Sequence, residues 1–274
     1  MIKKNLKVIY NFMNTKYEFD PAAAYETIKE DWTQFAERLN VTKWVLGVSG
    51  GKDSTVVAWL AAKIFGPTNV IGVMMPNGVQ HDIADSEMVI SKTKIMPLTI
   101  NIESAFVGLT TELKNKINCN DFGLKSDVTI NLPPRLRMAT VYAVAQQMNA
   151  MVLNTSNLTE DILGYATLWG DTCGSYAPIQ GLTVTEVIQL GEWLGIPEVL
   201  IRKVPADGLQ GSCDEDKLGL KYADADKLIR MNEAIDELRA KVLLKYKQNK
   251  FKIDMIHLTG PKFLDLPNFI KDKI

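Results

Sequence analysis

The chain has 274 residues, of which 46% are hydrophobic, and it carries a formal net charge of -1. We expect residues 1–274 to form a single α/β domain, because this length and apolar content suffice for one sizeable buried core. The near-neutral charge argues against nucleic acid as a partner, and no uncharged apolar run reaches the roughly 18 residues of a membrane span.

Cysteine and histidine content narrows the chemistry further. Three widely separated cysteines, Cys119, Cys173 and Cys213, form no C-x-x-C pair, which disfavours a disulfide framework and a zinc site. Neither His81 nor His257 has a cysteine or a second histidine nearby. Together with the absence of a signal-peptide core, this indicates a cytoplasmic protein whose chemistry depends on carboxylates, hydroxyls and backbone groups.

Helical and strand patterns alternate along the chain. The spacing of apolar side chains predicts helices over residues 21–39, 55–66, 84–92, 134–150, 183–194 and 224–248. Apolar runs between them predict strands over residues 44–48, 69–75, 96–100 and 151–153. In the first helix we expect one packed stripe of Ile28, Trp32, Phe35 and Leu39. The strand-helix-strand order implies an α/β fold with a doubly wound, mostly parallel sheet flanked by helices.

A polar loop, Ser49-Gly50-Gly51-Lys52-Asp53-Ser54, joins the first strand to the second helix. Its glycines allow a sharp turn that aims helix-start N–H groups at an anion. The common P-loop would need glycine in place of Leu46 and a hydroxyl residue in place of Asp53. Because a carboxylate repels phosphate unless a cation lies between them, we interpret Asp53 as a Mg²⁺ ligand, with Ser49 and Ser54 beside the phosphates. The alternative is an ordinary helix cap after a glycine turn.

Two further polar segments follow predicted strands at the same edge of the sheet, over residues 76–82 and 154–160. Ligands of such sheets bind beyond the carboxyl ends of the strands, so a composite site is expected there. Glu160 offers a second carboxylate for Mg²⁺ beside Asp53, with substrate phosphates completing the set of ligands. Its alternative role is a favourable negative charge early in a helix.

Several segments resemble known families. The loop at residues 49–54 is similar to the SGGxDS loop of ATP pyrophosphatases, which have an adenine nucleotide alpha hydrolase-like fold and cleave ATP to AMP and pyrophosphate. Five other segments resemble the N-x-x-x-R-x-R-M, G-T-x-x-x-x-E, G-x-x-T-x-x-G-D, K-x-P-x-A-x-L…D-E-x-x-L-G and P-x-G-x-Q motifs of ammonia-dependent NAD synthetases. They lie at residues 131–138, 154–160, 164–171, 203–219 and 76–80. Their number and order make this resemblance far more specific than any one motif.

The resemblance implies an enzyme that converts deamido-NAD, ATP and ammonia to NAD, AMP and pyrophosphate through an acyl-adenylate, with Mg²⁺ as cofactor. It implies catalytic roles for Asp53 and Asp171 and metal binding by Asp53 and Glu160. ATP contacts are expected at Gly47, Ser49, Gly50, Gly51, Asp53, Ser54, Gln80 and Thr155. Contacts to deamido-NAD are expected at Arg135, Arg137, Trp169, Asp171 and Asp207.

Phosphate binding by the two arginines is also predicted without reference to the family. Arg135 and Arg137 follow Pro133-Pro134 near a predicted helix start, and arginine binds phosphate through paired hydrogen bonds. Alternatively they are surface residues that pair with Asp127 or Glu160.

Chain length bears on the nitrogen donor, and the family resemblance bears on the oligomeric state. A glutamine-dependent enzyme needs a second catalytic domain with a nucleophilic cysteine, and a chain of this length filled by one domain has no room for it. We therefore expect ammonia as the donor. The resemblance also implies a homodimer, with the helices over residues 134–150 and 183–194 as candidate interface elements.

Three positions depart from the family's pattern. Met74 and Val184 stand where relatives carry basic residues, and Ser175 stands where an acidic residue is expected. Lys52, where many relatives have glutamine or valine, could act in catalysis by supplying one missing positive charge near the phosphates. Two other functions stay open: another ATP pyrophosphatase, such as a tRNA-modifying ligase, and a catalytically inactive nucleotide-binding relative.

Overall fold

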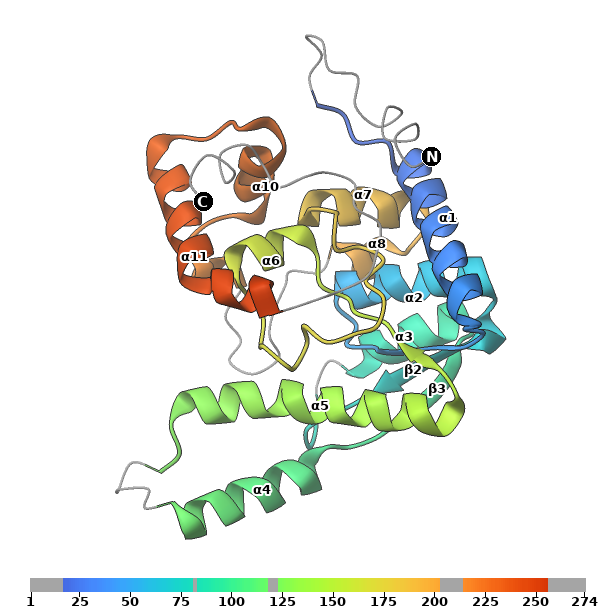
Figure 1. The fold of residues 1–274 in the computed structure, drawn as a ribbon, viewed down its shortest axis with the longest axis vertical. Coiled ribbons are helices and arrows are strands. Elements are labelled where there is room, and N and C mark those ends of the chain that lie inside the picture. The colour runs from blue at the N-terminus through green and yellow to red at the C-terminus, as the bar shows by residue number, and fades with distance from the viewer. Residues whose placement is uncertain (1–16, 81–82, 118–122, 203–213, 256–274) are drawn as a thin grey trace.

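A four-stranded parallel sheet forms the centre of the molecule (Figure 1). The computed structural model describes residues 17–80, 83–117, 123–202 and 214–255. The strands described are β1 (Trp44–Gly47), β2 (Val70–Met74), β3 (Met96–Thr99) and β4 (Met151–Val152), in the spatial order β3-β2-β1-β4. The predicted parallel α/β sheet is confirmed. Because the strand order reverses between β1 and β4, the loops after these two strands meet at the position where such sheets bind ligands.

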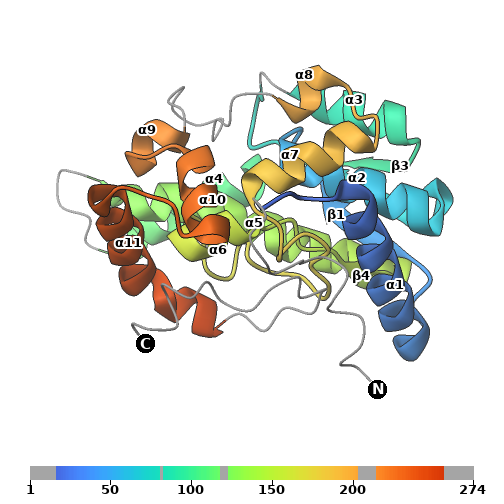
Figure 2. The same ribbon diagram turned by 90° about the horizontal axis from the view of Figure 1, so that it is seen from above.

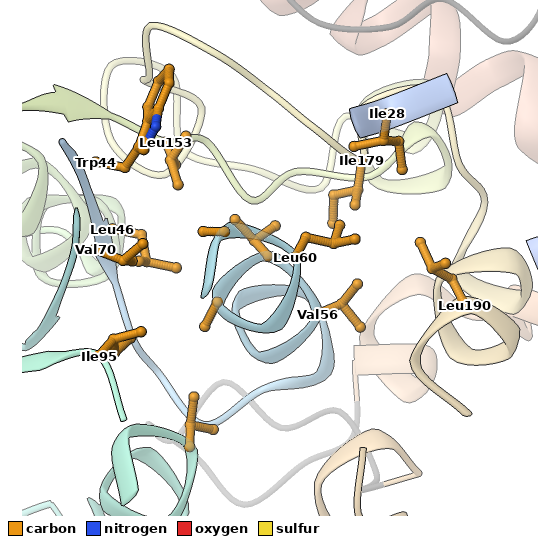
Figure 3. Packing of buried hydrophobic residues seen from close by; sticks show 14 of the residues in the cluster. Ile28, Trp44, Leu46, Val56, Leu60, Val70, Ile95, Leu153, Ile179 and Leu190 are labelled. Atoms are coloured by element: carbon orange, nitrogen blue, oxygen red, sulfur yellow. The ribbon is translucent and has the colours of Figure 1, made fainter. Parts of the chain in front are cut away.

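One face of the sheet is covered by a group of helices that share a hydrophobic core. They are α1 (Pro21–Leu39), α2 (Lys52–Phe65), α3 (Ile83–Thr93), α7 (Val184–Trp193) and α8 (Glu198–Ile201), and a short 3-10 turn, Pro67–Asn69, leads from α2 into β2. Figure 3 shows Val56 and Leu60 of α2 between Leu46 of the sheet and Leu190 of α7. Since α2 is surrounded by apolar side chains, the polar loop at its N-terminus is held at a fixed place.

The opposite face packs against α5 (Ser126–Met148). Successive side chains of a strand point to opposite faces, so Leu46 joins the first core whereas Val45 joins the second, with Val141 and Val144 of α5. A helix on each face of a parallel sheet is the doubly wound arrangement predicted from the sequence.

A third hydrophobic cluster lies beside the sheet rather than on it. It joins α6 (Leu158–Leu163) to α9 (Asp214–Leu218), α10 (Tyr222–Met231) and α11 (Asp236–Met255). Figures 1 and 2 both show α11 alongside α6, away from α1. The C-terminal helices therefore pack on the segment that follows β4.

Helix α4 (Glu103–Lys116) lies alongside the first half of α5, and together they extend away from the sheet (Figure 1). The sequence patterns did not predict α4, nor the short helices α8 and α9, and a helix at α6 appeared only in the alternative role given to Glu160. Helix α4 buries only Thr110, so it lacks the apolar stripe on which helix prediction depends.

Two predicted helix boundaries were wrong. The helix expected from residue 134 begins at Ser126 and contains Pro133 and Pro134. The carbonyls that lose a helical donor to these prolines belong to the exposed Thr129 and Ile130, where water can replace the missing N–H groups.

The helix expected over residues 224–248 is two helices, α10 and α11. Asn232 ends α10 in the left-handed conformation, with φ of 59°, which asparagine adopts more readily than most residues. In α1, Ile28, Trp32 and Phe35 are buried as predicted, but Leu39 in the last turn is exposed. No helix in the described part of the chain is long and apolar enough to cross a membrane.

We expect Leu60→Ala to lower the free energy of unfolding by about 2–5 kcal/mol, because it opens a cavity in the core around α2. Leu60 is 0% exposed, whereas Leu39 is 47% exposed. Leu39→Ala is therefore the matched control and should cost less than about 1 kcal/mol. Urea unfolding followed by circular dichroism measures both, and equal losses would contradict the packing described here.

Candidate active site

The loop after β1 has a tightly constrained backbone. Gly50 has a φ of 77°, and a Cβ atom there would lie 2.7 Å from Cβ of Asp85 and 2.9 Å from the backbone nitrogen of Ser86. Both the left-handed conformation and the close approach of α3 therefore require glycine. The hydroxyls of Ser49 and Ser54 lie 3.0 Å apart, and Ser49 Oγ also accepts a hydrogen bond from the Gly51 N–H at 3.2 Å.

The N-terminus of α2 is open to an anion. Gly51 is its N-cap residue and provides no side-chain cap, so the first-turn N–H groups lack the usual side-chain acceptor. Phosphate oxygens are well suited to accept from such groups, because the helix dipole also favours negative charge there. Gly47, Ser49, Gly50, Gly51 and Ser54 lie around this turn, which agrees with their predicted position but does not test their contacts to ATP.

Asp53 lies in the first turn of α2 with both carboxylate oxygens engaged. Its Oδ2 accepts a hydrogen bond from Nζ of Lys52 at 2.7 Å, and its Oδ1 accepts one from Nδ2 of Asn157 at 3.0 Å. Lys52 is only 6% exposed, and its ammonium group also lies 5.6 Å from the ring centroid of Tyr222 in α10. A buried cation thus occupies one side of the carboxylate that we interpret as a metal ligand.

Glu160 comes from the segment after β4 and lies close enough to Asp53 to interact with it. Desolvation is the main cause that raises the pKa of Glu160 well above its usual value, and the negative charge of Asp53 raises it further. Lys52 acts in the opposite direction. Asn157 donates to both carboxylates, from Nδ2 to Asp53 at 3.0 Å and from its backbone N–H to Glu160 at 3.4 Å, so the structure places the two acids at the same edge of the sheet.

These two carboxylates fit Mg²⁺ as part of a larger set of ligands. In the described residues no group of three or more histidine, cysteine, aspartate or glutamate side chains could hold a metal ion. Magnesium is commonly bound by one or two carboxylates together with substrate phosphates and water. The oxygen donors and the adjacent anion-binding turn agree with such a site, and the ammonium group of Lys52 lies on Asp53, where a metal ion could take its place.

The segment after β2 is fixed by hydrogen bonds to the start of α4. Gly78 has a φ of 78°, its N–H donates to Oδ1 of Asn101 at 3.1 Å, and the same oxygen accepts from the N–H of Glu103. Nε of Arg137 donates to the carbonyl of Met75 at 3.0 Å. Arg137 therefore lies beside this strand end, whereas Gln80 is half-buried at the end of the described segment.

The loop between α6 and α7 carries Asp171 and Trp169. The Asp171 Oδ1 accepts a hydrogen bond from the Thr167 N–H at 2.7 Å, and Trp169 is 52% exposed with a φ of 60°. Asp171 is open to solvent, but protein surrounds it densely, and this partial desolvation raises the pKa of its carboxyl to about 6. Nε of Arg135 donates to the carbonyl of Leu168 at 3.2 Å, so α5 delivers Arg135 to the same loop.

Asn154 ties this loop to the end of β4. It is 1% exposed, and its Nδ2 donates to the carbonyls of Asp171 at 3.0 Å and Cys173 at 3.3 Å. Thr155 follows it and is half-buried. The predicted residues of the loop around Asp171 and those of the segment after β4 are thus brought together by a buried amide.

Lys252 of α11 was not among the site residues predicted from the sequence. Its Nζ donates to the carbonyls of Gly164 and Ala166, each at 2.9 Å, and its charge lowers the pKa of Asp171 in opposition to desolvation. Desolvation lowers the pKa of Lys252 itself. No local pattern distinguishes it from the neighbouring lysines, because its role depends on a contact between segments distant in sequence.

Other expectations have mixed outcomes. Arg135 forms no ion pair within the described residues, so the alternative pairing with Asp127 or Glu160 is not seen for it. Asp207 and the rest of residues 203–213, the first part of the segment 203–219 that resembles a family motif, lie outside the described residues, as do His81 and Asp82.

The three departures occupy unlike environments. Met74 is buried in β2 and Val184 is buried in the first turn of α7, so neither side chain leaves room for a charged group without rearrangement. Ser175 is half-buried and forms a side-chain hydrogen bond with Tyr142.

Comparison with known proteins gives a consistent result. The family model described as NAD synthase matches residues 24–259. A relative from Thermococcus kodakarensis, named NH(3)-dependent NAD(+) synthetase, is 37% identical over 77% of this chain and 80% of its own. A relative of the same name from Pyrococcus horikoshii is 35% identical over 75% of this chain and 77% of its own.

Solved structures are similar over a comparable length. The structure of NMN synthetase from Francisella tularensis has a TM-score of 0.79 and 27% identity, covering 89% of this chain and 99% of that one. NH3-dependent NAD synthetase from Campylobacter jejuni has a TM-score of 0.70 and 23% identity, covering 90% of this chain and 100% of that one. The second similarity bears on the fold alone.

Proposed function

The chain belongs to the NAD synthase family, and we propose that the site between β1 and β4 carries out ATP-dependent amidation in the ammonia-dependent formation of NAD. The relatives support the overall reaction, in which deamido-NAD, ATP and ammonia give NAD, AMP and pyrophosphate. The assignment of each step to particular residues is our proposal. One observation carries it: Asp53 and Glu160 converge beside the uncapped N-terminus of α2.

The first step activates a carboxylate that is otherwise a poor acyl donor. Its oxygen attacks the α-phosphorus of ATP, pyrophosphate leaves, and an acyl-adenylate forms. The N–H groups at the start of α2 and the hydroxyls of Ser49 and Ser54 would bind the departing phosphates and stabilise their negative charge. Asp53 and Glu160 would hold Mg²⁺, which supplies charge neutralisation at the phosphates when bound.

The second step replaces AMP by ammonia. Asp171 lies in a solvent-open position with a pKa raised to about 6, so at neutral pH it is mostly ionised and can orient ammonium or accept its proton. Lys252 and the Thr167 N–H stabilise the ionised form against desolvation. No covalent bond to the protein is needed, because the adenylate itself is the activated species.

The substrate's nucleotide portion would contact the loop beside α5. Arg135 and Trp169 offer a cation and an exposed aromatic ring there, and Arg137 lies nearer the end of β2. A second candidate acyl substrate is nicotinic acid mononucleotide, which the similarity to NMN synthetase favours. Both substrates present the same carboxylate, so the two proposals share the chemistry and differ only in the AMP half of the dinucleotide.

We also propose a homodimer. Helices α4 and α5 expose Val107, which is 52% exposed, and Ile130, which is 44% exposed, on the part that extends from the sheet (Figure 1). A second copy packed on this part would bury these side chains, and their burial would stabilise the dimer that the family resemblance implies. Helix α7, the other expected interface element, instead packs on α1 and α2 of its own chain. The cytoplasmic location stays a prediction.

Purified protein with ATP, Mg²⁺, ammonium and deamido-NAD should form NAD and AMP in equal amounts. Asp53→Asn should lower kcat/KM by about 100-fold or more, because a ligand of the charge-stabilising metal is lost. Asp236→Asn, an exposed carboxylate on α11, is the control and should leave the rate unchanged.

Parallel reactions test the substrates: one contains nicotinic acid mononucleotide in place of deamido-NAD, and another contains glutamine in place of ammonium. Amidation of the mononucleotide alone would select the second candidate, and absence of AMP formation with either substrate would refute both.

Lys52→Gln should raise the KM for ATP by about 5- to 10-fold, since one positive charge beside the phosphates is lost. Lys63→Gln provides the matched control, because Lys63 is exposed in the last turn of the same helix. Initial rates over a range of ATP concentrations give the KM values. An unchanged KM in Lys52→Gln would mean that this lysine does not serve the phosphates.

The dimer predicts a solution mass of twice the chain mass of 30.6 kDa. Val107→Glu should weaken the dimer by about 10-fold or more, because a charge would be buried in the apolar contact. Val199→Glu places the same change on α8, where the residue is 59% exposed, and should leave the mass unchanged. Light scattering coupled to size exclusion measures all three proteins, and a monomeric unaltered chain would refute the dimer.

A further inference from the structure

Asn157 lies between the two carboxylates of the site and touches the segments that carry both. Its Nδ2 donates to Oδ1 of Asp53 at 3.0 Å, and its Oδ1 accepts from the N–H of Glu160 at 3.0 Å. Oε2 of Glu160 in turn accepts from the N–H of Asn157 at 3.4 Å. We propose that Asn157 is a positioning residue that holds Asp53 and Glu160 in the arrangement that binds the metal, an inference that rests on the proposed function.

The side chain needed at this position must donate and accept at the same time. The donor faces a carboxylate on α2, and the acceptor faces a backbone N–H on α6, and asparagine carries both groups on one short, planar amide. Serine has a single hydroxyl with shorter reach, and aspartate has no donor when ionised. Asn157 is 0% exposed, so packing leaves its amide little freedom to choose other partners.

The two oxygens of Asp53 have partners of different kinds. Both partners are buried, but Asn157 is a neutral amide whereas Lys52 carries a positive charge. A metal cation can replace the ammonium group of Lys52 at Oδ2, because one positive charge takes the place of another. The neutral hydrogen bond at Oδ1 can stay in place when the metal binds. Asn157 therefore fixes the direction of the carboxylate while leaving the other oxygen exchangeable.

The tie joins two helices before any metal binds. Asp53 lies on α2 and Glu160 on α6, and the amide of Asn157 links the Asp53 carboxylate directly to the first turn of α6. The amide holds both groups before the metal arrives, so less of the binding free energy is consumed in ordering them. Loss of the contact should therefore appear in metal affinity.

A helix cap without this role is the competing explanation, and the chain contains a control for it. Helix α7 begins with the same capping box, in which Thr183 takes the place of Asn157 and Glu186 that of Glu160. Thr183 forms its cap hydrogen bond with Glu186 and none with Asp53 or Glu160. Thr183→Ala thus removes a cap of the same kind away from the two carboxylates.

The test compares Asn157→Ser with Thr183→Ala in the full chain. Serine remains a good N-cap, so Asn157→Ser removes mainly the donor to Asp53. Mn²⁺ serves as the probe, and its dissociation constant is measured by electron paramagnetic resonance with and without ATP. We expect about a 10-fold weaker Mn²⁺ affinity in Asn157→Ser, together with a similar rise in the Mg²⁺ concentration for half-maximal NAD formation. Thr183→Ala should change both quantities less than about twofold, whatever its effect on the urea midpoint.

Unchanged Mn²⁺ affinity in folded Asn157→Ser would overturn the inference and leave Asn157 as a cap only. If the serine variant does not fold, Asn157→Thr takes its place, because threonine fills more of the vacated volume, and the same two outcomes apply. The double variant gives a further check. If Asn157→Ser weakens Mn²⁺ affinity by the same factor in a chain that already carries Asp53→Asn as in the unaltered chain, the inference is overturned, because Asn157 would then act without Asp53. Failure of the unaltered chain to form NAD would refute the proposed function alone, because Mn²⁺ binding is measured independently of turnover.

Discussion

The desolvation of Glu160 beside the negative charge of Asp53 is the constraint around which the site is organised. Desolvation is the main cause that raises the pKa of Glu160 well above its usual value, and the negative charge of Asp53 raises it further. Lys52 supplies opposite charge at Asp53, and Asn157 supplies a neutral donor that keeps the carboxylate in place. Bound Mg²⁺ with substrate phosphate would also neutralise these carboxylates. Lys52 and Asn157 therefore stabilise, without substrate, the arrangement of acids that the metal and phosphates would bind.

The fold makes this arrangement possible by bringing together segments about one hundred residues apart. β1 and β4 are adjacent and parallel, so the turn that carries Asp53 and the segment that carries Glu160 leave the sheet at the same edge. The core around α2 fixes the first segment, and the capping box of α6 fixes the second. A shift of α2 along the sheet would break the hydrogen bond from Asn157 before it disturbed the apolar packing, because a hydrogen bond is the more directional of the two.

The sequence predicted those parts of the fold and site that depend on local patterns. The strands, α1, and the placement of Asp53 and Glu160 at strand ends follow from apolar runs and polar turns, and they appear in the structure. The role of Asn157 and the inward position of Lys252 did not follow, because each depends on a contact with a distant segment. The start of α5 was placed too late for a different reason. Proline is favoured in the first turn of a helix and disfavoured inside one, so local rules began the helix at Pro134, whereas exposure of the freed carbonyls allows it to begin earlier.

The C-terminal helices α10 and α11 contact residues of the proposed active site as well as packing on α6. Lys52 lies against the ring of Tyr222 in α10, and Lys252 of α11 binds the loop that leads to Asp171. Each end of the proposed reaction, the phosphates and the ammonia, is therefore linked to this layer through one lysine. This layer packs on α6 through α11, whereas α10 packs on both α6 and α7. Helix α6 carries Glu160 and contacts both α10 and α11, so the proposed metal ligand lies on a helix that packs against the two helices in contact with Lys52 and with the loop before Asp171.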